Sequence, residues 1–181
     1  MSLRIYGNRP LKTLPGLETR PTPARVRTAV FNIWQRSITN CRWLDLCTGT
    51  GAMAAEALCR GASLVVGIEQ SGKACAIIQQ NWQRVATAEQ SFQVIRGDVL
   101  QQLSHLSGQQ FDHIYFDPPY ASPLYEPVLT AIGQYRLLAD DGELAAEHSP
   151  TRKMPEQVAP LVLTRQKTYG NTALSFYQVE P

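Results

Sequence analysis

The sequence has no apolar run long enough to cross a membrane. Its 181 residues are 44% apolar, but nowhere do they form the ~20-residue apolar stretch that a membrane-spanning helix needs. The N-terminus also lacks an apolar signal region. We therefore expect a soluble, cytoplasmic protein, and the length suggests a single globular domain.

Patterns that form metal sites or disulfides are also missing. The four cysteines, Cys41, Cys47, Cys59 and Cys75, show no CxxC spacing. Three of them lie in stretches predicted to be buried, where cysteine behaves as a small apolar residue. The three histidines are scattered along the chain, so the sequence predicts no metal site.

Acidic residues are scarce at the N-terminus. Residues 1–42 carry eight Lys and Arg residues against one acid, Glu18, whereas the other 139 residues carry nine basic and fourteen acidic residues. A basic segment attached to a mildly acidic body indicates contact with a polyanion, and a solvated basic helix face explains the charge about equally well. We place the boundary after residue 38, with a basic arm and helix at 1–38 and the main domain at 39–181.

Apolar runs of strand length alternate with helical patterns. We predict strands at 42–46, 64–69, 92–96, 111–116 and 142–147, helices at 52–60, 71–85, 99–106 and 125–138, and a closing hairpin at 161–167 and 173–179. A short hairpin around Gly7-Asn8 precedes them. This alternation is typical of an α/β fold with a doubly wound sheet.

One more helix is predicted just after Arg20. Thr22 is its expected N-cap, and Pro23 is expected at its first position. Its apolar stripe contains Val26, Ala29, Val30, Ile33 and Trp34. Arg25 and Arg27 lie off this stripe, so we expect them to meet solvent or phosphate.

The segment 111–120, FDHIYFDPPY, ends a predicted buried strand with two prolines. Proline donates no ladder hydrogen bond, so the backbone leaves the sheet at this point. Asp117 and the Pro118 carbonyl can accept both N–H groups of one planar exocyclic amine, while the Tyr120 ring stacks on the base that carries it. A capped proline turn is the plain alternative, which the upstream glycine loop disfavours.

That glycine loop, Asp45–Gly51, joins a strand to a helix. Residues 49–54 fit the weak dinucleotide pattern GxGxxG/A, and Glu69 is placed to hold a ribose diol, so a nicotinamide-binding reading stays open. Asp45, however, is a poor neighbour for a pyrophosphate and a good one for a cationic amino acid. Asp98 can meet an adenine amino group. These features favour S-adenosylmethionine, with helix capping as the alternative role for Glu69 and Asp98.

The expected site residues come from these loops. The cofactor-binding set is Asp45, Thr48, Gly49, Gly51, Glu69, Gln70, Asp98, Val99 and Asp117, and the catalytic set is Asp117, Pro118, Pro119 and Tyr120.

The motifs together resemble a known family. LDLCTGTG at 44–51, Glu69, Gly97-Asp98 and DPPY at 117–120 are similar to class I S-adenosylmethionine-dependent amino-methyltransferases. The segments at 20–34 (RPTPARVRTAVFNIW), 58–62 (LCRGA) and 169–177 (YGNTALSFY) resemble the RsmD family, bacterial enzymes that methylate the 2-amino group of a guanine in 16S ribosomal RNA. The resemblance covers nearly the whole chain.

The resemblance implies a Rossmann-like, seven-stranded, mostly parallel sheet with an antiparallel last strand. It also implies that Arg20–Thr22 lie near the cofactor or the target base. We expect small-subunit ribosomal RNA, or an assembling small subunit, to be contacted by Arg20, Thr22, Arg25 and Arg27, and we expect a monomer. Methylation of DNA adenine or protein glutamine, a nicotinamide oxidoreductase and a non-enzymatic RNA-binding module are the alternatives.

Overall fold

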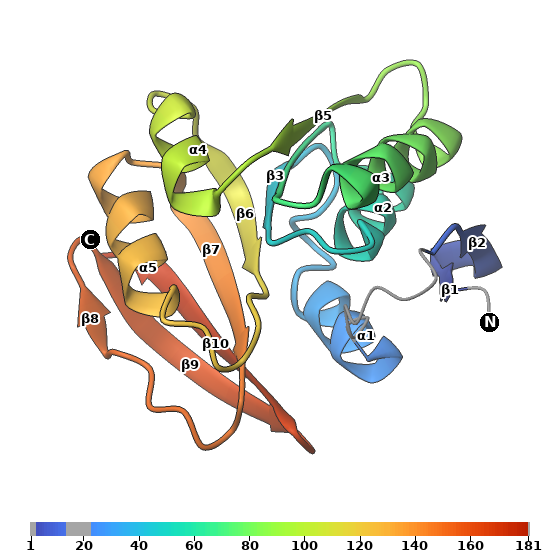
Figure 1. The fold of residues 1–181 in the computed structure, drawn as a ribbon. Coiled ribbons are helices and arrows are strands. Elements are labelled where there is room, and N and C mark those ends of the chain that lie inside the picture. Colours follow the sequence, from blue (N-terminus) through green and yellow to red (C-terminus); the bar gives the residue numbers. More distant parts are fainter. Residues whose placement is uncertain (1–2, 14–22, 181) are drawn as a thin grey trace.

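The computed structural model describes residues 3–13 and 23–180, which form one sheet flanked by helices and a small N-terminal hairpin (Figure 1). The elements, in chain order, are β1 (Leu3–Ile5), the 3₁₀ turn η1 (Tyr6–Asn8), β2 (Arg9–Leu11), α1 (Ala24–Ile33), β3 (Arg42–Leu46), α2 (Ala52–Cys59), β4 (Leu64–Glu69), α3 (Gly72–Val85), β5 (Ser91–Arg96), α4 (Val99–His105), β6 (Phe111–Phe116), α5 (Tyr125–Gln134), β7 (Leu138–His148), β8 (Gln157–Val158), β9 (Leu161–Tyr169) and β10 (Thr172–Val179).

The main sheet has the strand order β5-β4-β3-β6-β7-β10-β9-β8. The first five strands of this order pair in parallel, and β10 pairs antiparallel with β7 and with β9. The mostly parallel sheet with an antiparallel last strand is confirmed. The sheet has eight strands rather than seven, because the two-residue β8 pairs with the outer edge of β9.

Side chains alternate across the sheet and build two separate cores. Trp43 and Tyr115 pack with α1, α2 and α3, whereas Leu44 and Ile114 pack with α4 and α5. Both sides of the parallel strands are therefore covered by helices, as expected for strands that read as nearly continuous apolar runs. Helices α2 and α5, which follow the neighbouring strands β3 and β6, lie on opposite faces.

Helix α1 buries most of the predicted stripe and adds to it. Val26, Val30 and Trp34 are buried, Ala29 and Ile33 are half-buried, and Arg27 and Phe31 are buried beside them. Pro23 stands at the N-cap rather than inside the helix. Thr22, the predicted N-cap, lies outside the described residues. The expectation that Arg27 faces solvent is wrong, because Arg27 lies one turn before Phe31 on the packed face.

The Arg27 side chain is held by an ion pair instead. Its Nε donates to Glu56 Oε2 at 2.7 Å, and its Nη2 donates to the carbonyl of Arg4 at 2.8 Å. Glu56 also receives Arg60 at 2.8 Å. The pair links α1 to α2 and to the N-terminal hairpin, which places part of the basic segment inside the structure.

The other departure lies between α5 and β7. Helix α5 ends at Gln134, before the predicted 138, and Arg136 has a positive φ of 52° that ends the helical path. Strand β7 starts at Leu138 rather than at 142, and its pairing with β6 shifts register between Phe111 and His113. The irregular pairing keeps Asp140-Asp141-Gly142, which reads as a turn, inside the strand.

Within residues 3–13 and 23–180, none of the helices has the length and hydropathy to traverse a bilayer.

Arg27→Ala should destabilise the fold. It leaves the buried Glu56 carboxylate with Arg60 as its remaining ion-pair partner, and breaking a buried pair costs about 3 kcal/mol. Urea unfolding would measure the change. Arg84→Ala removes an exposed guanidinium from α3 and should change stability by no more than about 0.5 kcal/mol. Equal stability of the two variants would contradict the structural role of Arg27.

Candidate active site

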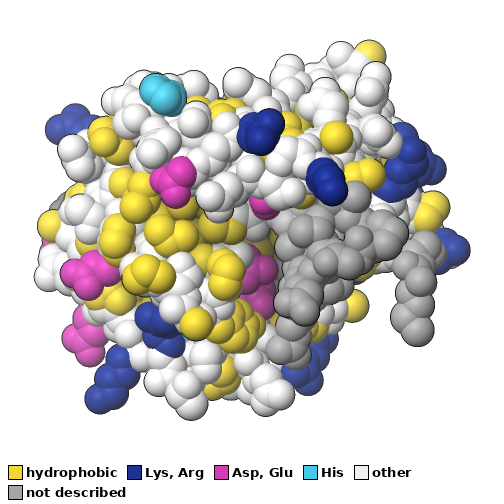
Figure 2. All heavy atoms as spheres, in the orientation of Figure 1, with side chains coloured by type: hydrophobic (Ala, Val, Ile, Leu, Met, Phe, Trp, Pro, Cys, Tyr) yellow, Lys and Arg dark blue, Asp and Glu magenta, His cyan; other side chains and the backbone are white. Residues whose placement is uncertain are grey.

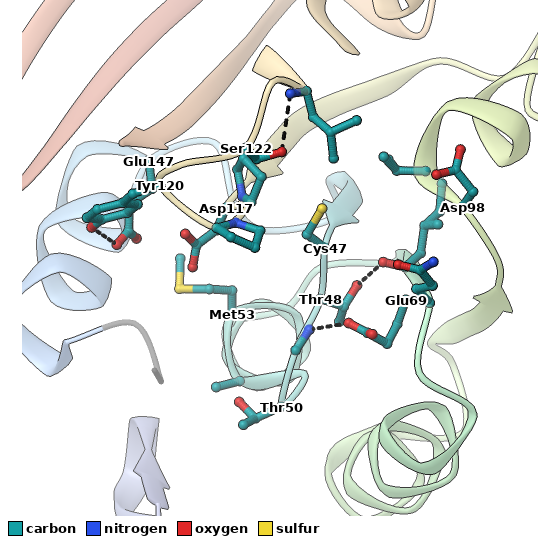
Figure 3. A pocket seen from close by; sticks show the side chains of 18 of the residues that line it. Cys47, Thr48, Thr50, Met53, Glu69, Asp98, Asp117, Tyr120, Ser122 and Glu147 are labelled. Atoms are coloured by element: carbon teal, nitrogen blue, oxygen red, sulfur yellow. Dashed lines mark hydrogen bonds between the residues drawn. The ribbon is translucent and has the colours of Figure 1, made fainter. Parts of the chain in front are cut away.

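A cavity of about 610 Å³ opens at the carboxyl ends of the parallel strands. It lies where the strand order reverses, between the loops that follow β3 and β6, which is the usual ligand position in open α/β sheets. Loops after β4 and β5 and the end of β7 complete its wall. Figure 3 shows Asp117, Tyr120 and Glu147 on one side of Cys47, and Glu69 and Asp98 on the other.

The glycine loop after β3 forms the floor of the cavity. Gly49 and Gly51 both have positive φ, of 59° and 76°. A Cβ at Gly51 would lie 2.8 Å from Trp82 Nε1, which donates to the Gly51 carbonyl at 2.9 Å. Gly49 lines the cavity, whereas Gly51 lies behind it and packs on Trp82. Of the two glycines predicted to contact the cofactor, Gly49 therefore lines the cavity and Gly51 does not.

Glu69 closes the loop from the neighbouring strand. Its Oε2 accepts the Gly49 N–H at 2.9 Å and its Oε1 accepts the Ser71 N–H at 2.8 Å. The carboxylate lines the cavity beside Thr48, whose hydroxyl lies between the carbonyls of Asp45 and Ile68. Two backbone donors thus fix Glu69 in one orientation, and its remaining lone pairs suit a diol.

Asp45 does not reach the cavity wall. It is 2% exposed, is not among the lining residues, and accepts the Ala54 N–H at 3.2 Å beneath the loop. Burial, followed by the nearby charge of Glu69, raises the pKa of Asp45 well above its ordinary value. The Asp45 carboxylate thus supports the loop through its hydrogen bond to Ala54, and its pairing with a cationic ligand group stays a prediction.

The loop after β5 supplies Asp98 and Val99, and both line the cavity. Asp98 is also the N-cap of α4, where its Oδ1 accepts the Gln101 N–H at 3.1 Å. Asp98 therefore both caps α4 and lines the cavity. Gln70, at the end of β4, is exposed and lines the rim.

The Asp117–Tyr120 loop forms the opposite wall. All four of its residues line the cavity, as the sequence predicted for the catalytic set. The Tyr120 hydroxyl donates to Glu147 Oε1 at 2.8 Å and lies 2.8 Å from Thr172 Oγ1. Burial raises the pKa of Tyr120 above its ordinary range, so the phenol stays neutral.

Several lining residues escaped the sequence reasoning. Pro23, Cys47, Met53, Ser122, Leu124 and Glu147 also face the cavity. No local motif marks Glu147, because it reaches the site only through the pairing of β7 with β6. Of the predicted RNA contacts, Arg25 is exposed two residues after Pro23, Arg27 is buried, and Arg20 and Thr22 lie outside the described residues.

The cavity is acidic. Glu69, Asp98, Asp117 and Glu147 line it, and the described lining residues include no Lys or Arg. Burial, followed by nearby carboxylates, raises the pKa of the Cys47 thiol to about 12. On the face shown in Figure 2, apolar side chains gather near the middle, acidic ones lie both in the middle and at the left margin, and basic ones lie at the margins and in the upper middle. Such a site favours a cationic ligand over a pyrophosphate.

Comparisons with known proteins agree with this chemistry. The family described as "Conserved hypothetical protein 95" matches residues 3–178. This chain belongs to that family, the family of RsmD. Ribosomal RNA small subunit methyltransferase D of Escherichia coli (strain K12) is 30% identical over 185 residues, covering 98% of this chain and 90% of that protein.

Two further relatives of this RsmD-family chain span it almost completely. YlbH of Bacillus subtilis (strain 168), a candidate rRNA methyltransferase, is 34% identical over 172 residues, covering 94% of this chain and 93% of YlbH. The solved structure of yhhF from Escherichia coli, a candidate methyltransferase, has a TM-score of 0.83 and 28% identity and covers 99% of both chains.

The RsmD-family chain is an S-adenosylmethionine-dependent methyltransferase. The residues present fit the cofactor: S-adenosylmethionine is cationic at sulfur and at its amino group, and the cavity is lined by carboxylates. Glu69, predicted to hold the ribose, and Asp98 and Val99, predicted to meet the adenine, all line this cavity. A dinucleotide carries a negatively charged pyrophosphate, which the carboxylates lining this cavity disfavour.

Glu69→Gln should weaken binding of S-adenosylmethionine. An amide NH₂ in place of either oxygen faces the N–H of Gly49 or Ser71, and the negative charge is lost. We expect calorimetry to show a Kd about tenfold higher, or ~1.4 kcal/mol. Glu89→Gln changes an exposed glutamate in the α3–β5 connection and should leave the Kd unchanged. Equal affinities for the two variants would remove Glu69 from the cofactor site.

Proposed function

We propose that this enzyme methylates the exocyclic 2-amino group of a guanine in small-subunit ribosomal RNA. The observation that carries the proposal is that Asp117, Pro118 and Tyr120 share one cavity with Gly49 and Glu69. Asp117 and the Pro118 carbonyl, which can accept two N–H bonds from one amine, thus lie in the same cavity as the residues predicted to hold the cofactor. Full-length relatives named for small-subunit ribosomal RNA support the choice of substrate.

The Asp117–Tyr120 loop binds the amine through two hydrogen-bond acceptors. The carboxylate of Asp117 and the carbonyl of Pro118 can each accept one N–H of the 2-amino group. The exposed ring of Pro119 and the half-buried ring of Tyr120 flank the opening, where a base turned out of its helix can stack. Two fixed acceptors hold the amine so that its lone pair points out of the ring plane.

When bound, S-adenosylmethionine supplies a methyl group as an electrophile on a sulfonium. Asp117 and the Pro118 carbonyl would hold the amine so that its lone pair accepts that methyl group, with the bonding electron pair left on the sulfur of the cofactor. The alkylated nitrogen then releases one N–H proton to Asp117 or to water. The protein contributes alignment of the amine and a preorganised acceptor rather than a strong base.

The RNA is proposed to lie along the basic margin of the cavity face, with residues 1–38 as its main contact. Arg25 supports this placement, because it is exposed and follows Pro23, which lines the cavity. Arg20 and Thr22 belong to the proposal through the family resemblance. Arg27 is left out, because its guanidinium is committed to Glu56 and Arg4.

The test of the function is to map a tritiated methyl group. Small subunits and naked RNA from cells that lack the protein are incubated with the enzyme and labelled cofactor, and the modified nucleoside is identified. We expect N2-methylguanosine in the small-subunit RNA. Label on duplex DNA, on protein glutamine or on the adenine amino group would overturn the proposal in favour of that acceptor.

Asp117→Ala should abolish most methyl transfer. Removing one of the two amine acceptors is expected to lower kcat by about 10²–10³-fold, with little change in cofactor affinity. Asp140→Ala, at an exposed aspartate of β7, is the matched control and should retain full turnover. Turnover near the wild-type level in Asp117→Ala would remove the carboxylate from the mechanism.

Arg25→Glu should weaken RNA binding and flatten its dependence on salt. Each lost phosphate contact reduces the slope of log K against log salt by about 0.7–0.9. Filter binding at several salt concentrations measures both effects. Arg84→Glu makes the same charge change at the far end of α3 and should leave the slope unchanged. Identical slopes for Arg25→Glu and wild type would exclude Arg25 from the interface.

A further inference from the structure

Tyr120 is hydrogen-bonded both at its hydroxyl and at its backbone carbonyl. Its hydroxyl donates to Glu147 Oε1 at 2.8 Å and lies 2.8 Å from Thr172 Oγ1 (Figure 3 shows the Glu147 bond). Its backbone carbonyl accepts Arg152 Nη2 at 2.9 Å. The three partners come from the end of β7, the β7–β8 connection and the start of β10, so they converge on one residue from separate parts of the chain.

The partners are themselves fixed. Glu147 and Thr172 are 3% and 2% exposed, and Glu147 also receives the hydroxyl of Tyr115. The Glu147 carbonyl accepts the Tyr125 hydroxyl at 3.0 Å. Arg152 lies over the Tyr125 ring, 4.3 Å from its centroid, and also donates to the Ser122 carbonyl at 3.2 Å.

This arrangement exceeds what the loop itself needs. Two prolines already restrict the backbone, and a stacking ring needs no hydroxyl bond in order to stack. The hydrogen bonds of the hydroxyl restrict rotation of the ring about its side-chain torsions, and the hydrogen bond of the carbonyl fixes the backbone from which the ring extends. The wall beside Asp117 is thereby held in one plane before any base arrives.

We propose that Thr172, Glu147 and Arg152 are positioning residues for methyl transfer, because they hold the Tyr120 ring in the plane that the target base must match. The proposal rests on the proposed function in one respect, namely that Tyr120 faces the acceptor base. A rigid wall lowers the cost of ordering the base and aligns its amine, so the effect falls on turnover more than on cofactor binding.

Thr172→Val tests the hydroxyl bond at nearly constant volume. We expect kcat to fall about tenfold while the Kd for S-adenosylmethionine stays unchanged, and Thr172→Ser should restore turnover. Tyr120→Phe should produce a similar loss. Because both changes break the same bond, the double variant should be no slower than the slower single variant, whereas independent roles would multiply the two losses. Wild-type kcat in Thr172→Val, or multiplied losses, would overturn the proposal.

Arg152 offers a matched control in the next residue. Arg152→Gln removes the donor to the Tyr120 carbonyl, whereas Lys153→Gln removes the same charge from an exposed side chain. We expect kcat to fall in the first variant and to stay at the wild-type level in the second. Equal turnover in both would contradict the positioning role.

A second measurement needs no RNA. With ¹³C-labelled tyrosine, the Tyr120 ring signals should report slow ring flips in wild type and faster flips in Thr172→Val and Arg152→Gln. Unchanged flipping would overturn the inference even if the variants failed to turn over. If the enzyme methylates no RNA but the variants show the expected change in flipping, the proposed function is refuted. The inference that these residues restrain the Tyr120 ring would still hold.

Discussion

Two helices that pack on opposite faces of one sheet create the site. Strands β3 and β6 lie side by side and run parallel, yet α2 covers one face and α5 the other. The loops that lead to these helices must therefore turn away from each other. The separation leaves a cavity between the Gly49 loop and the Asp117–Tyr120 loop without any special cavity-forming residue. The two loops are neighbours because their strands are neighbours.

Electrostatics then decide what the cavity accepts. Several carboxylates face a partly desolvated space, and the mutual repulsion of like charges is relieved when a cation enters. Burial is the main cause of the raised pKa of the Cys47 thiol, and the carboxylates around it add to the effect by disfavouring a thiolate. The same carboxylates repel phosphate, so under the proposed function the RNA backbone stays outside the cavity and a single base enters it.

Short-range patterns predicted most of the fold and much of the site. Glycine and proline at strand ends have local conformational consequences, so the Gly49 loop, Glu69, Asp98 and Asp117–Tyr120 could be placed from sequence. Arg27 and Asp45 could not, because whether a charged side chain lies inward depends on what packs against it. Arg27 is buried because it pairs with Glu56, which lies 29 residues later in the chain.

Long-range pairing explains the other misses. The strand character of Asp140-Asp141-Gly142 comes from an irregular register with β6 rather than from local propensity. The two-residue β8 exists only because β9 offers it an edge. Glu147, Arg152 and Thr172 carry no motif, and they meet at Tyr120 because the end of β7, the β7–β8 connection and the start of β10 lie side by side.

The place of β10 in the sheet has a consequence for how the protein is made. This strand is inserted between β7 and β9, although both are synthesised before it. Until Thr172–Val179 leave the ribosome, one side of β7 has unsatisfied backbone donors and acceptors. Glu147 and Tyr120 therefore gain their neighbour Thr172 only after β9 has been made, and a nascent chain that stalls before β10 presents an aggregation-prone edge at β7.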